Sequence, residues 1–536
     1  LNHIFNSQTK TISGAAGILA LSALISRILG IARDWLLAKT FGAGPELDIY
    51  FAAFRIPDLV FNILIAGGVI VAFLPLFSEY FSKNENEAWK FTNNTLNVFL
   101  LLLISLSVIL FIFAPLLIKL ITPGFDSEKL NQTIFLTRIL FLSPILLGLS
   151  SIFSGILQYF NRFLIYSLSP ILYNLGIIFG ILFLAPQFSV LGVIIGVIFG
   201  AFLHFIIQIP SAINCGLKYQ PIFNLKESGI KRVFLLMIPR TLAIAGLQIN
   251  LIVITAIAST LAVGSISIFN FANNLQYFPI GIIGASFAIA VFPSLTRSLV
   301  NGAKEEFVKN FSSVFRHILY LIIPLSILIF ILRNQIVEII FRYGKFSQLS
   351  TQLTSASLGL FCFGILALCL IPLISRAFFA FQDTKTPTIM VFLAMILNIA
   401  LSFYLTWLLK SENFFQIFIK NTFSLQGIED IRVVGLPLAF SVSAIFQVFL
   451  LIIFLYRRIG DFKLKEIFNS FLKILFASIL MTIGIYFITR IVFGGIIFQT
   501  FVVILASFII YLISTFFLKS PESKAILKRF SRNAKH

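Results

Sequence analysis

Long apolar stretches without charge follow one another along most of the chain. About 20 apolar residues cross a hydrocarbon core of about 30 Å, so a charge-free interval of that length predicts one membrane helix. Seven intervals without Asp, Glu, Lys or Arg predict one span each: 59–78, 91–118, 139–161, 346–375, 386–409, 433–456 and 491–518. Two longer intervals, 163–217 and 241–296, are broken at Pro186-Gln187 and Gly264-Ser265 and predict two helices each.

Three further segments complete the pattern. Intervals 317–332 and 474–489 are short, but arginine and lysine at their ends can extend to the headgroups, so both predict spans. The apolar stretch that begins near residue 14 predicts the first helix. The expected fold is therefore an all-α polytopic membrane protein with about fourteen transmembrane helices.

Composition supports this class and orients the chain. Of 536 residues, 59% are hydrophobic and 11% charged, which excludes an ordinary soluble domain. The formal charge of +20 predicts contact with anionic membrane lipids and not with nucleic acid, because the basic residues lie between apolar runs. Alternate loops, counted from the N-terminus, hold 25 basic residues against 12 in the others, so we expect both termini in the cytoplasm.

A weak internal repeat predicts two pseudo-symmetric lobes around a central cavity. Gly44 with Phe51-Ala52 recurs 220 residues later as Gly264 with Phe271-Ala272. Such repeats are common in transporters that bind substrate between lobes. We expect an N-terminal lobe at 1–217 (helices 1–6), a C-terminal lobe at 218–456 (helices 7–12), two additional helices at 457–518 and a basic cytoplasmic tail at 519–536.

Charged residues concentrate in the first two predicted helices. Charges inside membrane helices are costly and usually face a pathway. Asp48 and Arg55, seven positions apart, share a helical face, and Arg55 and Asp58 are close enough in sequence to pair. The candidate substrate-binding residues are Arg27, Arg33, Asp48 and Arg55, with Asp34 as a further cavity-lining candidate. Interfacial anchoring by local salt bridges is the alternative for Arg33, Asp34 and Asp48.

Amide side chains gather in the predicted eighth helix. Asn270, Asn273 and Asn274 lie close to one helical face and are candidates for lining a wet cavity. Helix–helix hydrogen bonding is at least as good an explanation of the same pattern.

The chain shows no sign of enzymatic chemistry. No GxxxxGK[ST] loop occurs, so we expect a transporter without its own ATPase. The four histidines and three cysteines are scattered, and no metal, cofactor or catalytic site is predicted. Guanidinium groups suit phosphate oxygens, so a cavity with these arginines predicts an anionic ligand. An inside-negative membrane potential would drive such an anion outward.

Several ordered motifs resemble one known family, the MurJ (MviN) lipid II flippases of the multidrug/oligosaccharidyl-lipid/polysaccharide exporter superfamily. The matching stretches lie between Ser26 and Pro387. They are Ser26-Arg27-Ile28-Leu29-Gly30-Ile31-Ala32-Arg33-Asp34, Phe41-Gly42-Ala43-Gly44 before Asp48, Ala53-Phe54-Arg55-Ile56-Pro57, Thr122-Pro123-Gly124-Phe125, Asn161-Arg162-Phe163 with Pro170 and Asn174, Phe278-Pro279 through Pro293-Ser294-Leu295, Tyr343-Gly344-Lys345-Phe346, and Gln382-Asp383-Thr384-Lys385-Thr386-Pro387.

The resemblance implies a flippase that moves lipid II, the lipid-linked peptidoglycan precursor, from the inner to the outer leaflet of the bacterial cytoplasmic membrane by alternating access. Cell-wall biogenesis and cell shape would depend on it. By the same resemblance, Arg27 and Arg33 would bind the headgroup, and Asp48 would be an essential acid. Lipid II or a similar polyprenyl-diphosphate glycolipid is the implied partner, and cell-wall synthesis enzymes are further candidates.

The chain also departs from the family. Phe61 and Asn274 stand where the family usually has arginine, and Ala66 replaces a usual glutamate. These losses keep an alternative open, in which the same fold exports another polyprenyl-diphosphate-linked glycan or a small organic molecule. A non-transporting scaffold is the alternative from a different class. The family's sodium site is not predicted, because 233–296 and 386–409 contain no Asp or Glu.

Overall fold

The computed structural model describes residues 12–491 and 494–523. The predicted cytoplasmic tail therefore lies largely outside the described residues, from 524 onward. Within the described ranges every regular element is a helix and no strand occurs. The expected all-α fold is confirmed.

Eleven helices among the described residues are long and apolar enough to cross a membrane. They include the helices at Lys304–Ile331 and Leu464–Ile491, whose charge-free intervals were short in the sequence. Three further segments are α2 (Ile12–Phe41), the continuous α3–η1–α4 (Pro45–Val60, Phe61–Val69 and Ile70–Lys83), and α12 (Ser228–Ser259). α12 contributes a shorter apolar stretch, Ile244–Ser259. These three segments and the eleven helices correspond to the fourteen predicted ones.

The chain divides into two compact units. Unit 1 comprises residues 1–267 with 343–346, and unit 2 comprises 268–342 with 347–536. Besides α2, α3, η1, α4 and α12, the helices of unit 1 are α5 (Glu85–Ile121), α6 (Ser127–Leu140), α7 (Leu142–Tyr159), α8 (Phe163–Phe179), η2 (Gly180–Leu184), α9 (Ala185–Phe188), α10 (Val190–Ile206) and α11 (Ile209–Asn214).

Unit 2 begins inside α13 (Ser265–Pro279). Its other helices are η3 (Ile280–Gly284), α14 (Ala285–Val300), α15 (Lys304–Ile331), α16 (Arg333–Phe341), α17 (Gln348–Ala380), α18 (Lys385–Leu408), α19 (Phe414–Phe423), η4 (Arg432–Val434), α20 (Gly435–Ile459), α21 (Leu464–Ile491) and α22 (Ile496–Phe517). The units are defined by compactness, whereas the lobes were predicted from an internal sequence repeat. The lobes expected at 1–217 and 218–456 therefore stay a prediction.

Prolines mark two places where a helix changes its winding. Pro57 lies four residues before the π-helical segment η1, and Pro279 directly precedes η3. Proline removes one backbone hydrogen bond and lets the helix bend or widen locally. The irregular segment η1 therefore begins directly after α3, the helix that carries Asp48, Arg55 and Asp58.

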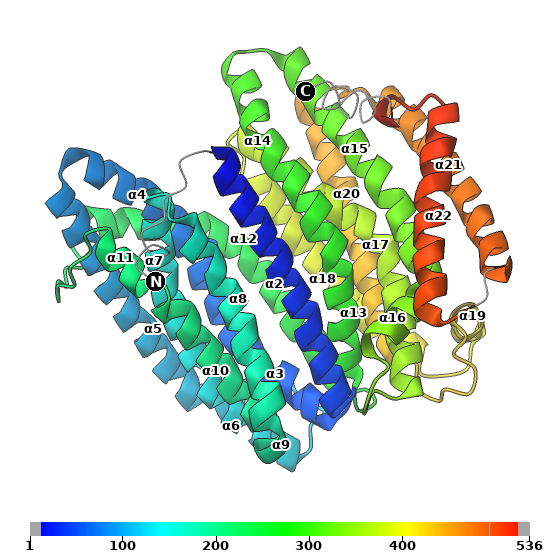
Figure 1. The fold of residues 1–536 in the computed structure, drawn as a ribbon, viewed down its shortest axis with the longest axis horizontal. Helices are drawn as coiled ribbons and strands as arrows, with labels where there is room; N and C mark the ends of the chain where they lie inside the picture. The colour runs from blue at the N-terminus through cyan, green and yellow to red at the C-terminus, as the bar shows by residue number, and fades with distance from the viewer. Residues whose placement is uncertain (1–11, 492–493, 524–536) are drawn as a thin grey trace. The chain divides into compact units, whose positions relative to one another are not determined.

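Glycines allow α8 and α10 to pack closely inside unit 1. A Cβ atom on Gly176 would lie 2.3 Å from the Cα of Gly200, and one on Gly180 would lie 2.7 Å from the Cα of Gly196. Small residues drive helix association in membranes because they let two backbones approach. This contact fixes α8, which runs beside α2 in Figure 1 and supports the charged end of that helix.

Large apolar side chains cover the outer surfaces of several helices. Ile112 and Leu116 on α5, and Phe501, Phe508 and Phe516 on α22, are more than half exposed. Water-soluble proteins rarely expose such continuous apolar surface, whereas a lipid-facing helix requires it. Together with the apolar spans, this identifies the chain as a multi-pass membrane protein.

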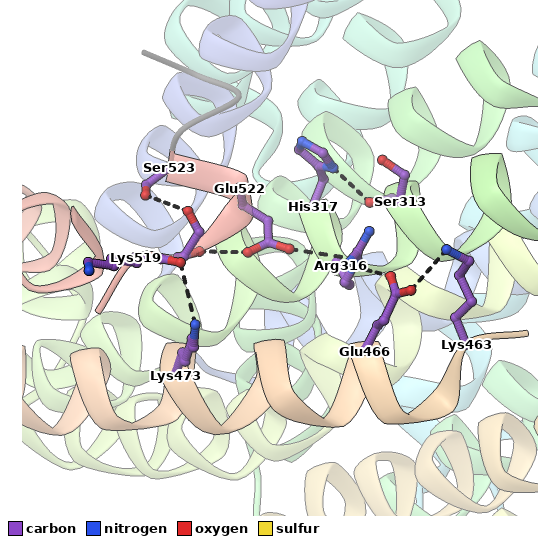
Figure 2. Close-up of polar contacts among 10 residues, drawn as sticks. Ser313, Arg316, His317, Lys463, Glu466, Lys473, Lys519, Glu522 and Ser523 are labelled. Carbon is purple, nitrogen blue, oxygen red and sulfur yellow. Dashed lines mark hydrogen bonds and ion pairs between the residues drawn. The ribbon is translucent and has the colours of Figure 1, made fainter. Parts of the chain in front are cut away.

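The end of the described chain packs against α15 and α21 in unit 2 (Figure 2). The buried Glu522 carboxylate lies 3.7 Å from Arg316 Nε and accepts a hydrogen bond from Ser520 Oγ. Arg316 also contacts Glu466 of α21 at 3.1 Å, and Lys473 of α21 donates to the Lys519 carbonyl. These polar contacts fasten α21 and the segment that follows α22 to α15.

Candidate functional site

The turn between α2 and α3 places Asp48 at the start of a buried helix. Gly44 precedes α3, Pro45 occupies its first position, and Glu46 and Asp48 lie in its first turn. Proline at the first position and acids in the first turn both favour helix initiation. Asp48 is nevertheless only 5% exposed, so its carboxylate needs partners from another element.

Asp48 finds these partners at the N-terminus of α13. Its Oδ2 atom accepts a hydrogen bond from the Gly264 amide at 2.6 Å. Its Oδ1 atom accepts from the Ser267 amide at 2.9 Å and from the Ser267 hydroxyl at 2.7 Å. A helix N-terminus presents unpaired amides and positive potential, so it stabilises a buried carboxylate. Asp48 thus joins the first turn of α3 to the first turn of α13.

Two close backbone contacts surround this junction and repeat with the sequence offset of 220 residues. A Cβ atom on Gly124 would lie 2.1 Å from the Ser259 carbonyl oxygen, and one on Gly344 would lie 2.2 Å from the Lys39 carbonyl oxygen. The Gly124 amide also donates to Ser259 Oγ, and the Lys345 amide donates to the Lys39 carbonyl. The ends of α2 and α12 therefore have equivalent neighbours, which gives the weak repeat a structural basis within unit 1.

Arg33 lies near the end of α2 between an acid and an amide. Its guanidinium donates to Asp34 Oδ1 at 2.8 and 3.0 Å, and to Asn174 Oδ1 of α8 at 3.3 Å. The Asp34 side chain is 8% exposed and that of Arg33 is 25% exposed. Asn174 in turn donates to Ser26 Oγ and to the Pro170 carbonyl. The guanidinium is thus oriented from two helices and still partly accessible.

Arg55 faces α12 and not its neighbour on the same helix. Its Nε atom donates to Thr255 Oγ1 at 2.7 Å, and the residue is 9% exposed. The ion pair with Asp58 that the spacing suggested does not form within 4 Å in the described structure. Asp48 and Arg55 do share one face, as predicted, since the first contacts the turn after α12 and the second contacts α12 itself.

Arg27 lies six residues before Arg33 on α2 and is half-buried. Within the described residues its guanidinium makes no hydrogen bond or ion pair of the kind that holds Arg33. The structure therefore does not join Arg27 to the cluster formed by Arg33, Asp34 and Asn174.

A polar cavity lies among α3, η1, α7, α8 and α10 of unit 1. It has a volume of about 380 Å³. Its lining includes Asp58, Asn62, Ser143, Tyr173 and His204, together with Phe61. Nothing in the sequence singled out Ser143, Tyr173 or His204, since no charged residue or catalytic motif accompanies them in their apolar stretches. Phe61, which replaces a usual arginine of the resembled family, is one of the cavity walls.

The predicted amide residues lie on α13. Asn270 and Asn273 are buried, whereas Asn274 is exposed in the described structure. Asn273 Oδ1 accepts a hydrogen bond from Gln276 Nε2 at 2.8 Å. This contact within one helix agrees with a structural role for Asn273 and leaves cavity lining by the three asparagines a prediction.

Two solved membrane proteins, a flippase and a transporter, share this fold. The structure of lipid II flippase MurJ in an inward closed conformation aligns with a TM-score of 0.77 and 27% identity, over 94% of this chain and 98% of that one. An inward-facing multidrug transporter of the MATE family aligns with a TM-score of 0.66 at 14% identity, over 84% of this chain and 99% of that one. The second likeness concerns the fold alone. Fold and intramembrane charges thus define a multi-pass helical membrane protein of the transporter class.

Sequence comparison narrows this class to one family. The family model for lipid II flippase MurJ matches residues 37–512. A probable lipid II flippase MurJ of Buchnera aphidicola subsp. Schizaphis graminum is 31% identical over 511 residues, which cover 92% of this chain and 94% of that protein. Lipid II flippase MurJ of Burkholderia cenocepacia is 28% identical over 373 residues, 68% of this chain and 72% of its own. The chain belongs to the lipid II flippase MurJ family.

Proposed function

We propose that this protein moves lipid II from the inner to the outer leaflet of the bacterial cytoplasmic membrane by alternating access. Membership of the lipid II flippase MurJ family is the observation that carries the proposal. The names of the matched relatives do not favour the alternative substrates, another polyprenyl-diphosphate glycan or a small organic molecule.

Arg33 and Arg55 bind the diphosphate of the headgroup in this proposal, and Arg27 attracts it toward them. Guanidinium forks bind phosphate oxygens through paired, charge-assisted hydrogen bonds. Three observations support these roles. All three arginines lie on helices of a membrane protein, Arg33 is oriented but one-quarter exposed, and Arg55 lies one turn before the polar cavity.

In this proposal Asp48 holds two turns together at the outer face of the membrane protein. We call these two joined turns the outer gate. With both termini in the cytoplasm, as the basic loops predict, the turn between α2 and α3 and the turn between α12 and α13 lie at the outer face. The three hydrogen bonds of the buried Asp48 carboxylate hold these two turns together. In this proposal outward opening breaks these bonds, and Asp48 controls opening without contacting the diphosphate.

The membrane potential supplies the driving force in this proposal. It is worth about 2.3 kcal/mol per charge per 100 mV. Its inside-negative sign favours outward movement of an anionic headgroup. Basic residues at the membrane surface contact anionic lipids, and cell-wall synthesis enzymes receive the translocated substrate.

Headgroup-labelled lipid II in proteoliposomes tests the assignment. Arg33→Ala removes charge-assisted hydrogen bonds worth about 1.5–3 kcal/mol each, so translocation should fall at least about tenfold. Arg27→Ala should weaken substrate capture. Arg342→Ala is the matched control, because Arg342 is exposed and pairs with Glu338 on α16. Unchanged translocation in both Arg27→Ala and Arg33→Ala would reject the assigned roles.

A further inference from the structure

Asp58 is an acidic residue in the lining of the polar cavity in unit 1, and the proposed function does not involve it. Its side chain is half-buried and lines a cavity with Asn62, Ser143, Tyr173 and His204. The volume of about 380 Å³ admits several water molecules, each of which takes about 30 Å³ in the liquid. Water in the cavity can therefore deliver a proton to the Asp58 carboxylate or remove one.

No neighbouring group holds this carboxylate directly. Among the described residues Asp58 accepts no side-chain hydrogen bond and forms no ion pair within 4 Å; Asn62 Nδ2 donates to its backbone carbonyl at 2.9 Å. Among the described residues, Arg55 and then Arg33 are the cations that interact electrostatically with Asp58. Each is bonded elsewhere, Arg55 to Thr255 and Arg33 to Asp34 and Asn174.

The other titratable and polar groups around Asp58 come from five helices. Tyr50 lies on α3 itself, and Tyr173 of α8 and His204 of α10 line the cavity or interact electrostatically with the acid. α7 contributes Ser143, and Arg138 of α6 donates to the Phe111 carbonyl instead. His204 is held in place, because its Nδ1 atom lies 2.7 Å from Ser150 Oγ, which also accepts from Gln208. Among these described groups, Asp58 is thus the acid whose protonation state no direct hydrogen bond to its carboxylate determines.

The charge balance of the cluster connects Asp58 to substrate. Asp34 already compensates Arg33, and an ionised Asp58 compensates Arg55 from one helical turn away. An incoming diphosphate would meet the negative charge of Asp58 beside the two guanidiniums. Like charges at close range in a membrane site repel strongly, and neutralising one of them removes the repulsion.

We propose that Asp58 is a proton-binding site and that it takes up a proton when unit 1 binds the anionic diphosphate headgroup. The proton comes from water in the cavity and stays on a carboxylate oxygen, and no covalent bond to substrate forms. The inference rests on the proposed function, since it requires the diphosphate to bind near Arg33 and Arg55. Because Asp58 directly follows Pro57 and precedes η1, a change in its charge occurs where the helix changes its winding.

Calorimetric titration of short-chain lipid II into the full-length protein in nanodiscs tests this proposal. Measurements at one pH in buffers of different ionisation enthalpy give the number of protons taken up on binding. The wild type should take up protons, and in the limit of one linked proton its affinity should fall about tenfold per pH unit on the alkaline side. Asp58→Asn should bind without proton uptake and with affinity independent of pH.

Two controls separate the outcomes. Asp58→Glu should restore proton uptake, and Glu87→Gln, at an exposed acid of α5, should behave like the wild type. Binding by the wild type without proton uptake, or uptake that persists in Asp58→Asn, would overturn the inference and leave the proposed function standing. Uptake that disappears in His204→Gln but persists in Asp58→Asn would assign the proton to the histidine instead. Failure of the wild type to bind lipid II would overturn both proposals.

Discussion

Asp48 and Ser267 are 219 positions apart, and the Asp48 carboxylate accepts hydrogen bonds from both the amide and the hydroxyl of Ser267. The contact joins the first turns of two helices that the sequence repeat relates to each other. A buried carboxylate on a helix N-terminus is a strong and directional connection. It also places all three hydrogen bonds of this junction on one side chain.

Asp48→Asn should therefore impair lipid II translocation at least about tenfold, since it weakens charge-assisted hydrogen bonds worth about 1.5–3 kcal/mol each. Ser267→Ala should have a smaller effect, because the Gly264 and Ser267 amides still bind the carboxylate. Translocation in proteoliposomes measures both variants. Substrate affinity should be nearly unchanged in each; equal loss of affinity and rate would contradict the role of Asp48 in the outer gate.

Gly344→Ala should destabilise the closed junction. The new Cβ atom would lie 2.2 Å from the Lys39 carbonyl oxygen, and the residue has φ +60°. Gly427→Ala is the matched control, because Gly427 has φ +81° and nothing within 4 Å of an added Cβ atom. Positive φ costs alanine about 1–2 kcal/mol at either site. Thermal unfolding in detergent should show a clearly larger loss for Gly344→Ala; equal losses would show that the close approach does not matter.

The contact between Glu79 and Arg232 predicts a pH dependence. Hydrogen bonding to Arg232 and then to Lys83 lowers the pKa of Glu79 from its ordinary 4.5 to about 2. Since the folded state binds this proton more weakly than the unfolded state, the stabilisation is complete above about pH 4.5 and is lost as the pH falls toward 2. Hydrogen exchange in the first turns of α12 should rise over this window.

Glu79→Gln should flatten that profile, whereas Glu87→Gln, at an exposed acid on α5, should leave it unchanged. The effect should be small, because exposed ion pairs contribute little and are screened by salt. A profile that stays as steep in Glu79→Gln would assign the pH dependence to other acids.

Glu522→Gln tests the polar contacts that fasten the end of the described chain. The variant keeps the size of the side chain but removes the charge that faces Arg316 and is 3% exposed. A buried charge that loses its partner costs about 1–3 kcal/mol, so the last turn of α22 should exchange hydrogens faster. Glu466→Gln, at a carboxylate whose side chain is 47% exposed, should have the weaker effect. The reverse order would show that Glu466 is the main partner.

Much of the fold could be predicted from the sequence, because charge-free stretches report membrane spans directly. The spans beginning at Lys304 and Leu464 were identified although their apolar cores are short, since flanking basic side chains extend them. The repeat of Gly44 at Gly264 was visible, but its contacts through Gly124 and Gly344 were not, because close approach of backbones leaves no mark beyond the glycines themselves.

The candidate site was predicted less completely. Arg33, Asp48 and Arg55 were identified because charge is rare in membrane helices. Their partners could not be, since Asn174, Thr255 and Ser267 are ordinary polar residues 141 to 219 positions away. The possible Arg55–Asp58 ion pair is not formed within 4 Å among the described residues, because Arg55 donates to Thr255 instead. Spacing along one helix carries no information about an acceptor on another. The cavity around Asp58 could not be predicted either, because its lining comes from helices that are far apart in the sequence.

The offset of 220 residues relates Lys39 to Ser259 and Gly124 to Gly344, and it places Ile268 where the first half of the chain has Asp48. Isoleucine offers no acceptor to the turn before α3. The close glycine contacts at Gly124 and Gly344 are therefore repeated in the two halves of the chain. The carboxylate of Asp48 is not repeated, because the equivalent residue is Ile268. Such a junction is chemically asymmetric, because one position carries a carboxylate with three hydrogen bonds and its repeat equivalent carries an apolar side chain.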